Sequence, residues 1–576
     1  MSAHQTRFAA PTIRAGAAVT HVRTPLTGGI LSVLALLASS TVVAKAGAIV
    51  RASAAGAHLD THLLKGGGTD DTAVLQRLLD SASGGRPVHL ILDGPALVSG
   101  LNIYGNTTLE CTAGAGLYLK DGSSRAILRN AHRSRGPVLD EHINIRGCFL
   151  NGNRRNQPSA NIPRPDLPNY TLPSGREKDG TFISGLQFLG VNYLVIDGVT
   201  LWNVRAFGAL IANASYVDIH NVIVDDGGGA NADLDEYDVT DGLHFKGPLR
   251  YVSIDSVKFR VGDDGIAFNA NDFETDDVTT RNDFGPYVGQ GPITDVTVSN
   301  VDFMAGQVCG IRILSTNELV DRIVISNVTG VVRAFLLEIS HWVNPTSFGN
   351  VGSVSISNVT VDPQPSAYDR LPFISIDGRM KALSFQGLTT ALLNERPVIQ
   401  IGPKASVGAI DLDVTAIDPN LVGNILRLEE GGRVEHMKIA LNWQGPAVDQ
   451  GKDPVIGSRG AIADLQWVDT PPLYVEGHVA AGDRSSLDVS FTQKLKEPVS
   501  GRGSTLKVNG QPRTIIRATL QPDGKTVRYS LASPLKSSDR VEWSYDGGRG
   551  DLRSLDGLEV HSVSLRVIQA ANAPSH

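Results

Sequence analysis

The chain has 576 residues, with 52 lysines and arginines against 59 aspartates and glutamates, so its formal net charge is −7. This mild acidity argues against a nucleic-acid partner, which calls for a basic surface, and 41% hydrophobic residues exclude wholesale disorder. Few aromatic residues (6%), 61 glycines and only three cysteines indicate many short strands joined by tight turns, without a disulfide framework.

The N-terminus, residues 1–46, has the features of an export signal. Residues 1–29 contain three arginines and no acidic residue, and an apolar stretch follows at 30–43. This stretch is short for a bilayer span and ends at Ala44-Lys45-Ala46, which fits a signal-peptidase site. An uncleaved anchor or a misplaced start codon are the alternatives. We therefore expect a secreted or periplasmic protein without membrane association after cleavage.

A short helix is expected near the start of the mature chain. Val74, Leu75, Leu78 and Leu79 lie on one face of a helix that begins just after Asp70-Asp71, either of which is a good N-cap. A helix of this kind closes the open end of a solenoid.

Six phrases of one pattern recur in the middle of the chain. Each alternates apolar and polar residues, turns at Gly, Asn or Ser, and resumes with valine; they lie at 195–199, 217–222, 252–257, 296–301, 323–328 and 354–359. Alternation with period two predicts strands, and turns spaced 23 to 44 residues apart fit one solenoid coil with inserted loops. We predict an all-β fold, a right-handed parallel β-helix over residues 47–469.

The pattern changes at Thr470. Residues 473–570 contain about seven alternating segments separated by turns such as Asn509-Gly510, which is typical of a β-sandwich. Phrases such as 487–491 and 541–546 resemble the bacterial immunoglobulin-like repeats of secreted adhesins and carbohydrate enzymes. We predict an Ig-like accessory domain over 470–576, a spacer or binding module without a catalytic cluster.

Two Asp-Gly phrases of the repeat carry the candidate chemistry. Asp241 and Asp264 each precede a glycine and lie 23 residues apart, which is one coil. Neighbouring strands are about 4.8 Å apart, so Asp264 is expected directly above Asp241, with Asp263 beside them and Cys309 next in the column. Repulsion between stacked carboxylates raises a pKa, which suits acid–base catalysis. Turn formation and calcium binding are the alternatives.

The same strands are expected to present two outward rows beside this column. The predicted substrate-binding residues are His244, Lys246, Asn269, Arg312 and Glu338. They could form a saccharide groove, in which Arg312 and Lys246 donate hydrogen bonds, or a solvated ladder of charges. Inserts at 227–239, 270–292 and 340–350 favour a walled cleft at this face, and Tyr287, His341 and Trp342 could stack on sugar rings there.

Metal sites receive little support from the sequence. The acidic insert 231–238 begins like a calcium-binding EF-hand loop, but Glu236 stands where glycine is required and Gly242 where the last carboxylate should be. We expect a solvated loop and no metal or cofactor, with calcium as a minor alternative. Cys111 and Cys148 lack zinc-type spacing and are expected to be small buried hydrophobic side chains.

Together, Asp70-Asp71-Thr72, the segment 147–153 and the two Asp phrases resemble the polygalacturonase family, glycoside hydrolase family 28, within the pectate-lyase-like β-helix superfamily. The resemblance covers about residues 60–450 and implies inverting hydrolysis, with Asp263 as general acid and with Asp241 and Asp264 activating water. The family has a histidine where this chain has Cys309, and its Arg-Ile-Lys phrase is absent from 333–338. These departures favour a substrate other than plain polygalacturonate.

We therefore predict an exported, monomeric glycoside hydrolase that acts on a polysaccharide. The first alternative is a polysaccharide lyase on the same scaffold, with His244, Lys246 or Arg312 acting as base or neutralising a uronate carboxylate. The second is a non-catalytic glycan-binding surface protein or adhesin.

Overall fold

The computed structural model describes residues 47–158, 175–226, 240–271, 284–341, 348–365, 370–391, 396–416, 425–443, 455–457, 461–480 and 483–568. The expected export signal at 1–46, the acidic insert at 231–238 and Trp342 lie outside these residues. Within the described ranges, no helix combines the length and the apolar character that crossing a membrane requires.

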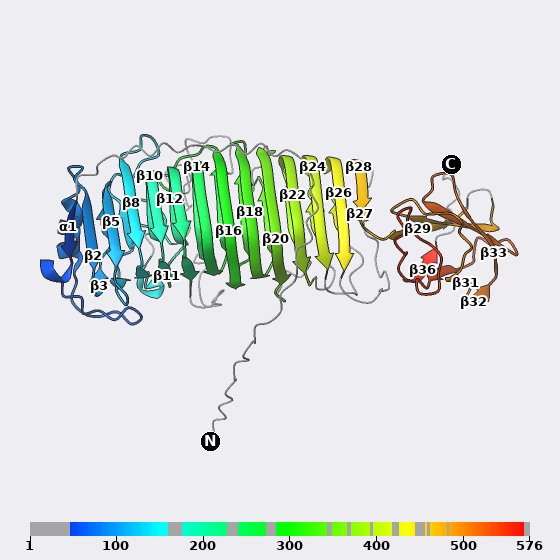
Figure 1. Ribbon diagram of the computed structural model, residues 1–576, viewed down its shortest axis with the longest axis horizontal. Helices are drawn as coiled ribbons and strands as arrows, with labels where there is room; N and C mark the ends of the chain where they lie inside the picture. The colour runs from blue at the N-terminus through cyan, green and yellow to red at the C-terminus, as the bar shows by residue number, and fades with distance from the viewer. Residues whose placement is uncertain are drawn as a thin grey trace, which may run out of the picture. The chain divides into compact units, whose positions relative to one another are not determined.

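Twenty-eight strands form coils in which each strand pairs in parallel with its counterparts one coil earlier and one coil later (Figure 1). One face is built from β1 (Ala48–Arg51), β2 (Val88–Leu92), β5 (Thr107–Cys111), β8 (Asp140–Arg146), β10 (Ser184–Asp197), β12 (Phe207–His220), β14 (Asp241–Arg260), β16 (Ile293–Ala305), β18 (Val320–Val332), β20 (Val351–Pro363), β22 (Arg379–Thr390), β24 (Ser406–Ala416), β26 (Arg433–Trp443) and β28 (Ile462–Val468). This stacking is the predicted right-handed parallel β-helix.

A second face carries the candidate site. It consists of β4 (Leu101–Ile103), β7 (Leu128–Asn130), the first halves of β10, β12 and β14, then β15 (Asp264–Asn271), β17 (Cys309–Ser315), β19 (Phe335–Ser340), β21 (Ile374–Asp377), β23 (Ile399–Ile401), β25 (Leu426–Leu428) and β27 (Val455–Gly457). The third face begins with β3 (Pro95–Val98), β6 (Gly116–Leu119), β9 (Phe149–Asn151), β11 (Thr200–Trp202) and β13 (Ile223–Asp225).

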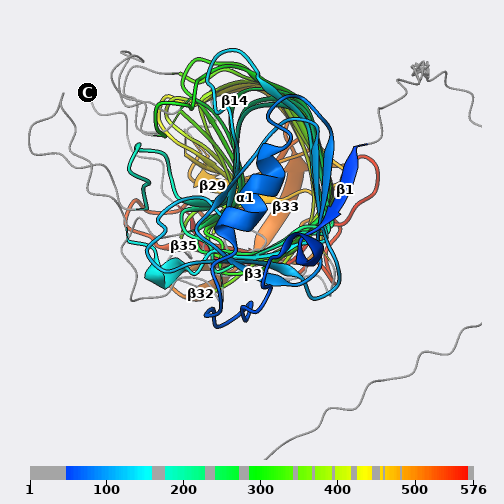
Figure 2. The ribbon, with the colours of Figure 1, turned by 90° about the vertical axis from the view of Figure 1, so that its left-hand side faces the viewer.

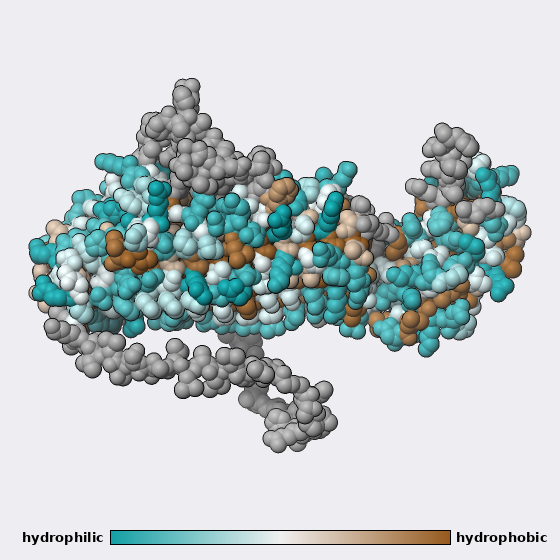
Figure 3. Space-filling view, turned by 90° about the horizontal axis from the view of Figure 1, so that it is seen from above, coloured by the Kyte–Doolittle hydropathy of each residue, from teal (hydrophilic) through white to brown (hydrophobic). Residues whose placement is uncertain are grey.

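The alternating side chains of the coils fill one continuous apolar core. Aromatic rings stack inside it from coil to coil, as in the pair Phe245 and Phe268, whose ring centroids are 5.3 Å apart. The helix α1 (Thr72–Asp80) buries Leu75 and Leu79 and lies across the N-terminal end of the coils (Figure 2), as the sequence predicts. The outer surface of the coils is mostly hydrophilic, with small scattered apolar patches on the face drawn in Figure 3.

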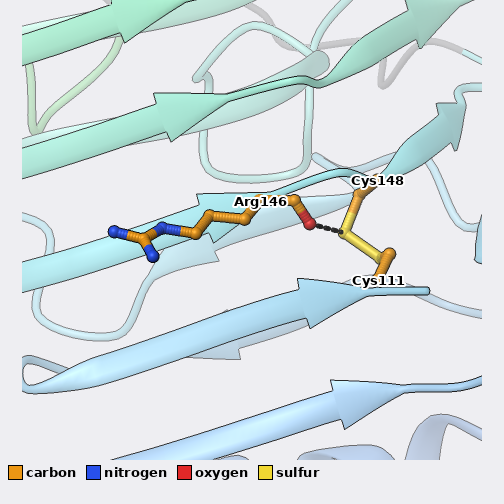
Figure 4. Close-up of a disulfide and its surroundings, with 3 residues drawn as sticks. All are labelled: Cys111, Arg146 and Cys148. Carbon is orange, nitrogen blue, oxygen red and sulfur yellow. Dashed lines mark hydrogen bonds between the residues drawn. A yellow bond between two sulfur atoms is a disulfide. The ribbon is translucent and has the colours of Figure 1, made fainter.

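Cys111 and Cys148 form a disulfide (Figure 4), so the prediction that both are merely small hydrophobic side chains is wrong. The strands β5 and β8 pair with Glu110 opposite Arg146. Cys111, the last residue of β5, and Cys148, just after β8, therefore lie on adjacent coils, with their Cα atoms 4.9 Å apart. The reason for the error is that 37 residues separate the two cysteines, whereas the regular repeat begins only after them.

Residues beyond Tyr474 form two antiparallel four-stranded sheets. The first has the order β29 (Tyr474–Val479), β30 (Ser486–Phe491), β34 (Thr526–Leu531), β33 (Ile515–Leu520), and the second the order β32 (Gln511–Arg513), β31 (Ser504–Val508), β35 (Val541–Tyr545), β36 (Val563–Ile568). Both sheets contribute to one apolar core, in which the rings of Tyr474 and Trp543 stack. The sheets agree with the predicted sandwich, and its Ig-like character stays a prediction.

Candidate active site

A ladder of glycines fixes the orientation of the carboxylate column. A Cβ atom on Gly242 would lie 2.3 Å from the Phe259 ring, and one on Gly265 would lie 2.5 Å from the Phe303 ring. Because these two rings fill the core at this corner, the residue after each aspartate has to be glycine. Each Asp-Gly phrase therefore presents its carboxylate outward at the start of a strand.

The strand register stacks the column as the 23-residue spacing predicts. Leu243 pairs with Ile266, which places the preceding Asp241 and Asp264 at equivalent positions, and Asp264 pairs with Cys309 in the following coil. Phe207 pairs with Asp241 from the coil before. The column thus contains two aspartates between a phenylalanine and a buried free cysteine.

Asp263 occupies the corner just before the strand. Backbone hydrogen bonds hold it there, since its N–H donates to the Thr240 carbonyl at 3.1 Å and its carbonyl accepts the Val308 N–H at 2.7 Å. Its side chain is half-buried, whereas Asp241 and Asp264 are only 5% and 4% exposed. Asp263 is therefore the carboxylate of the three that an incoming ligand reaches first.

The three carboxylates converge, with one oxygen of each lying within 4.8 Å of the others. Burial raises the pKa of Asp241 well above its usual value, and the nearby charge of Asp263 adds to this effect. Burial also raises the pKa of Asp264, against the opposing influence of Arg312. The ionised forms are costly because the carboxyl groups are removed from water beside like charges.

His244 holds Asp241 from one side. Its Nδ1 atom lies 2.7 Å from the Asp241 Oδ2 atom, and the backbone N–H of Asp264 donates to the other oxygen at 3.2 Å. The imidazole lies against the rings of Phe207 and Phe284, at centroid distances of 4.4 and 5.1 Å. These contacts fix the direction in which the Asp241 carboxylate points.

Arg312 holds Asp264 from the other side. Its Nε atom is 2.8 Å from Asp264 Oδ2, and its Nη2 atom is 3.3 Å from the Oε2 atom of Glu338 on the next strand. Burial raises the pKa of Glu338, while Arg312 opposes this effect. The guanidinium therefore links the buried Asp264 to the partly buried Glu338, beside which the sequence places Arg312.

Lys246 and Asn269 pair in the neighbouring row, also as predicted, but neither is exposed to solvent. The Lys246 Nζ atom lies 4.0 Å from the centroid of the Phe284 ring. An apolar cover lies over this part of the face and consists of Leu189, Ala206, Phe207, Leu210, Ala212, Phe284 and Val288. The row that the sequence presents as an open groove is thus buried under this cover from β10 to β14.

Other residues predicted near the cleft have protein partners. The Tyr287 ring lies 4.2 Å from the Arg133 guanidinium carbon, and the buried His341 places its Nε2 atom 3.5 Å from Asp377. Sequence reasoning missed the contacts of Phe207 and Phe284 with His244. Phe207 could have been found, since Phe207-Gly208 repeats the residue-then-glycine pattern one coil earlier, but Phe284 lies on an insert without periodicity.

No protein-family model matches the sequence, and no curated protein matches it. Solved structures with similar coils include the family 28 exopolygalacturonase of Yersinia enterocolitica (15% identity, 74% of this chain and 79% of that one, TM-score 0.47). The surface adhesin PfbA of Streptococcus pneumoniae is 11% identical over 77% and 96% of the chains, with a TM-score of 0.43. The A-module of the Azotobacter vinelandii mannuronan C-5 epimerase AlgE6 is 12% identical over 73% and 98%, with a TM-score of 0.45. At identities this low, the similarity concerns the fold alone. The chemistry of the site has to be argued from the residues of this chain.

Proposed function

We propose that the protein is an exported glycoside hydrolase that cleaves a polysaccharide at Asp241, Asp263 and Asp264. The convergence of one half-buried and two buried carboxylates at one corner carries this proposal. Glycoside hydrolysis needs a carboxylic acid that protonates the leaving oxygen and a carboxylate that activates water. Three carboxyl groups at one corner, one half-buried and two buried, provide enough groups for both roles.

Asp263 acts as the general acid, because its half-buried side chain is the most accessible of the three to a glycosidic oxygen. Asp241 and Asp264 orient and deprotonate the water. Their raised pKa values make them stronger bases when ionised. His244 and Arg312 are positioning residues, since each holds one of these carboxylates through a direct contact.

The stereochemical outcome is a separate question. The resemblance to family 28 implies inversion, for which carboxyl separations of about 6.5–9.5 Å are typical, against about 5–5.5 Å for retention. Here the nearest oxygens lie within 4.8 Å, a nearest-atom distance below both ranges, so the proposal of inversion rests on the resemblance alone. We propose inversion with the water held by the buried pair, and NMR of the first product anomer tests it. A retained anomer would contradict inversion while leaving the hydrolase assignment in place.

The lyase alternative finds less support at this face. A lyase needs an accessible Lys, Arg or His base, yet Lys246 is fully buried under Phe284 and the side chain of His244 is 6% exposed and occupied by Asp241. Lyase products carry a double bond that absorbs ultraviolet light, so an absorbance assay separates the two classes.

Export is supported by the disulfide between Cys111 and Cys148, because such bonds persist mainly outside reducing compartments. The proposed mature protein therefore begins after the basic and apolar leader of residues 1–46. The β-sandwich beyond Tyr474 is proposed as an accessory module that has no part in the chemistry.

The test is a turnover assay on a polysaccharide panel with an Asp263→Asn variant. We expect reducing ends from the native chain and at least about a hundredfold loss in the variant, as for removal of a general acid. Asp302→Asn, which changes an aspartate of β16 that lies 3.9 Å from Lys258, is the matched control and should retain full activity. Unchanged turnover in folded Asp263→Asn protein would contradict the assignment.

A further inference from the structure

A second polar site lies on the same face as the aspartate column, nearer the N-terminal end. It is a pocket of about 490 Å³ lined by Gly122, Ser123, Ser124, Arg125, Arg129, Pro158, Glu177, Lys178 and Asp179. Arg129 belongs to the row of His244, because Arg129 pairs with Gln187, which pairs with Leu210, which pairs with His244. Three strand steps of about 4.8 Å place the two sites about 14 Å apart.

The charges of this pocket do not balance. Glu177 and Asp179 each have an arginine partner: Arg129 Nη1 lies 2.6 Å from Glu177 Oε2, and Arg133 Nη2 lies 2.7 Å from Asp179 Oδ2. With both acids paired in this way, Arg125 and Lys178 are the surplus cations of the lining. Around this pocket, a protein of net charge −7 therefore has a local excess of positive charge.

Arg125 is held in place although it has no carboxylate of its own among the described residues. It lies across Gly100, where a Cβ atom would be 2.7 Å from both its Cδ and its Nε atoms. Its Nη2 atom donates to Asn102 Oδ1 at 3.0 Å, and Asn102 also accepts from Arg129 Nε at 3.0 Å. Its Nε atom is buried and has no hydrogen-bond partner within the described part of the chain.

The electrostatics of the pocket favour an anion. Burial lowers the pKa of Arg125 to about 10; the charges of Arg129 and Arg133 act in the same direction, and those of Glu177 and Asp179 oppose them. A bound carboxylate would offset this repulsion and would match the planar fork of a guanidinium.

We propose that this pocket binds the carboxylate of an acidic sugar through Arg125 and Lys178, at a position remote from the bond that is cleaved. The apolar cover separates the two sites, because Leu210 and Phe284, which lie between them, are buried in one cluster. The ligand is therefore a uronate unit at a distance from the cut, such as a branch or a neighbouring segment of a mixed polysaccharide. The identity of the ligand as a saccharide rests on the proposed function.

The test is calorimetric titration of the full chain with aldotriouronic acid, which carries one uronate on a neutral backbone, and with its uncharged methyl ester. We expect binding of the acid, at least about tenfold weaker binding of the ester, and a similar loss in Arg125→Gln and Lys178→Gln. Lys178 is exposed, so its variant tests the charge without disturbing the fold. Arg427→Gln, on β25 of the same face, is the matched control and should bind like the native chain.

Three results would overturn the proposal: affinity of Arg125→Gln and Lys178→Gln equal to that of the Arg427→Gln control, equal affinity for the acid and the ester, or binding of inorganic sulfate with no binding of the trisaccharide. The experiment also separates this proposal from the catalytic one. Asp263→Asn should lose turnover and keep trisaccharide binding at this pocket. Binding without turnover of any polysaccharide by the native chain would leave the pocket standing and contradict the hydrolase.

Discussion

Two groups of aspartates in the same coils have opposite properties. Asp241 and Asp264 lie at the corner of the site face, where burial raises their pKa values. Asp255 and Asp295 lie on the long strands β14 and β16, where hydrogen bonds from Ser299 and from Arg322, respectively, are the main cause of lowered pKa values. Asp295 meets Arg322 Nε at 2.7 Å in partly exposed surroundings.

The difference shows that an aspartate on a coil is not by itself a group suited to catalysis. The surroundings of each aspartate decide which physical effect is larger. Donors and water stabilise the ionised form at Asp255 and Asp295, whereas loss of water is the larger effect at Asp241 and Asp264. The corner residues are therefore the ones suited to proton transfer.

The strongest test of this comparison is catalytic. Asp264→Asn should lower kcat about 10²–10⁴-fold, because it removes one of the two proposed bases. Asp295→Asn should leave turnover unchanged, since that carboxylate binds Arg250, Arg322 and the Thr294 hydroxyl on another face of the coils. Steady-state kinetics on the best polysaccharide measures both, and similar losses in the two variants would abolish the distinction.

The arginines that bind these aspartates should also differ in how much they contribute to the free energy of unfolding. Arg312→Gln leaves Asp264 and Glu338 buried without their cation and should lower the free energy of unfolding by about 3–5 kcal/mol. Arg322→Gln, whose side chain is 51% exposed, should change it too little to resolve. Denaturant titration checks the pair; an equally small change for Arg312→Gln would mean that the corner is more hydrated than its burial indicates.

The glycine ladder should be required at the corner and dispensable elsewhere. Gly265→Ala places a methyl group against Phe303 and the Gly310 carbonyl, so we expect a loss of about 1–3 kcal/mol in the free energy of unfolding. Gly84→Ala is the matched control, because a Cβ atom there meets no atom within 4 Å. Thermal unfolding followed by circular dichroism compares the two, and a neutral Gly265→Ala would contradict the role given to the phenylalanine rings.

The smallest expected effect is on the pH dependence of stability. A carboxyl group whose folded pKa is raised above 3.8 destabilises the fold as pH rises from about that value through the folded pKa. Asp241→Asn should therefore raise the unfolding midpoint relative to the native chain more at pH 7 than at pH 4.

Asp255→Asn should behave in the opposite way. The lowered pKa of Asp255 contributes stability that is present above pH 3.8 and lost as pH falls through the folded pKa. Removing this carboxylate should lower the midpoint at pH 7 relative to the native chain, with a smaller difference in strong acid. Shifts of the same sign in both aspartate variants would remove the basis of the comparison.

The register of the site could be predicted from the sequence because each Asp-Gly phrase recurs after one coil. Aligning Cys309-Gly310 with these phrases places Cys309 above Asp264 and Arg312 in the row of His244, and both pairings agree with the structure. Repetition makes this prediction possible. Once two phrases are aligned, the alternation of side chains along each strand shows which residues lie side by side on the same face.

Features that do not repeat could not be predicted in this way. Phe284 reaches the site from an insert, so the periodicity of the coils does not predict that its ring covers Lys246. The contact between His244 and Asp241 depends on a side-chain direction that this cover imposes. Cys111 and Cys148 precede the regular repeat, where the coil length cannot be read from the sequence.

The disulfide also determines from which end the β-helix unfolds. Each coil of a solenoid contacts only its neighbours. Unfolding can therefore start at a terminal coil and advance one coil at a time. The bond between Cys111 and Cys148 ties together two early coils, just behind α1, and blocks such an advance from that end. Fraying should therefore proceed backwards from β28, and a protease that samples open coils would shorten the protein from its later coils toward the aspartate column.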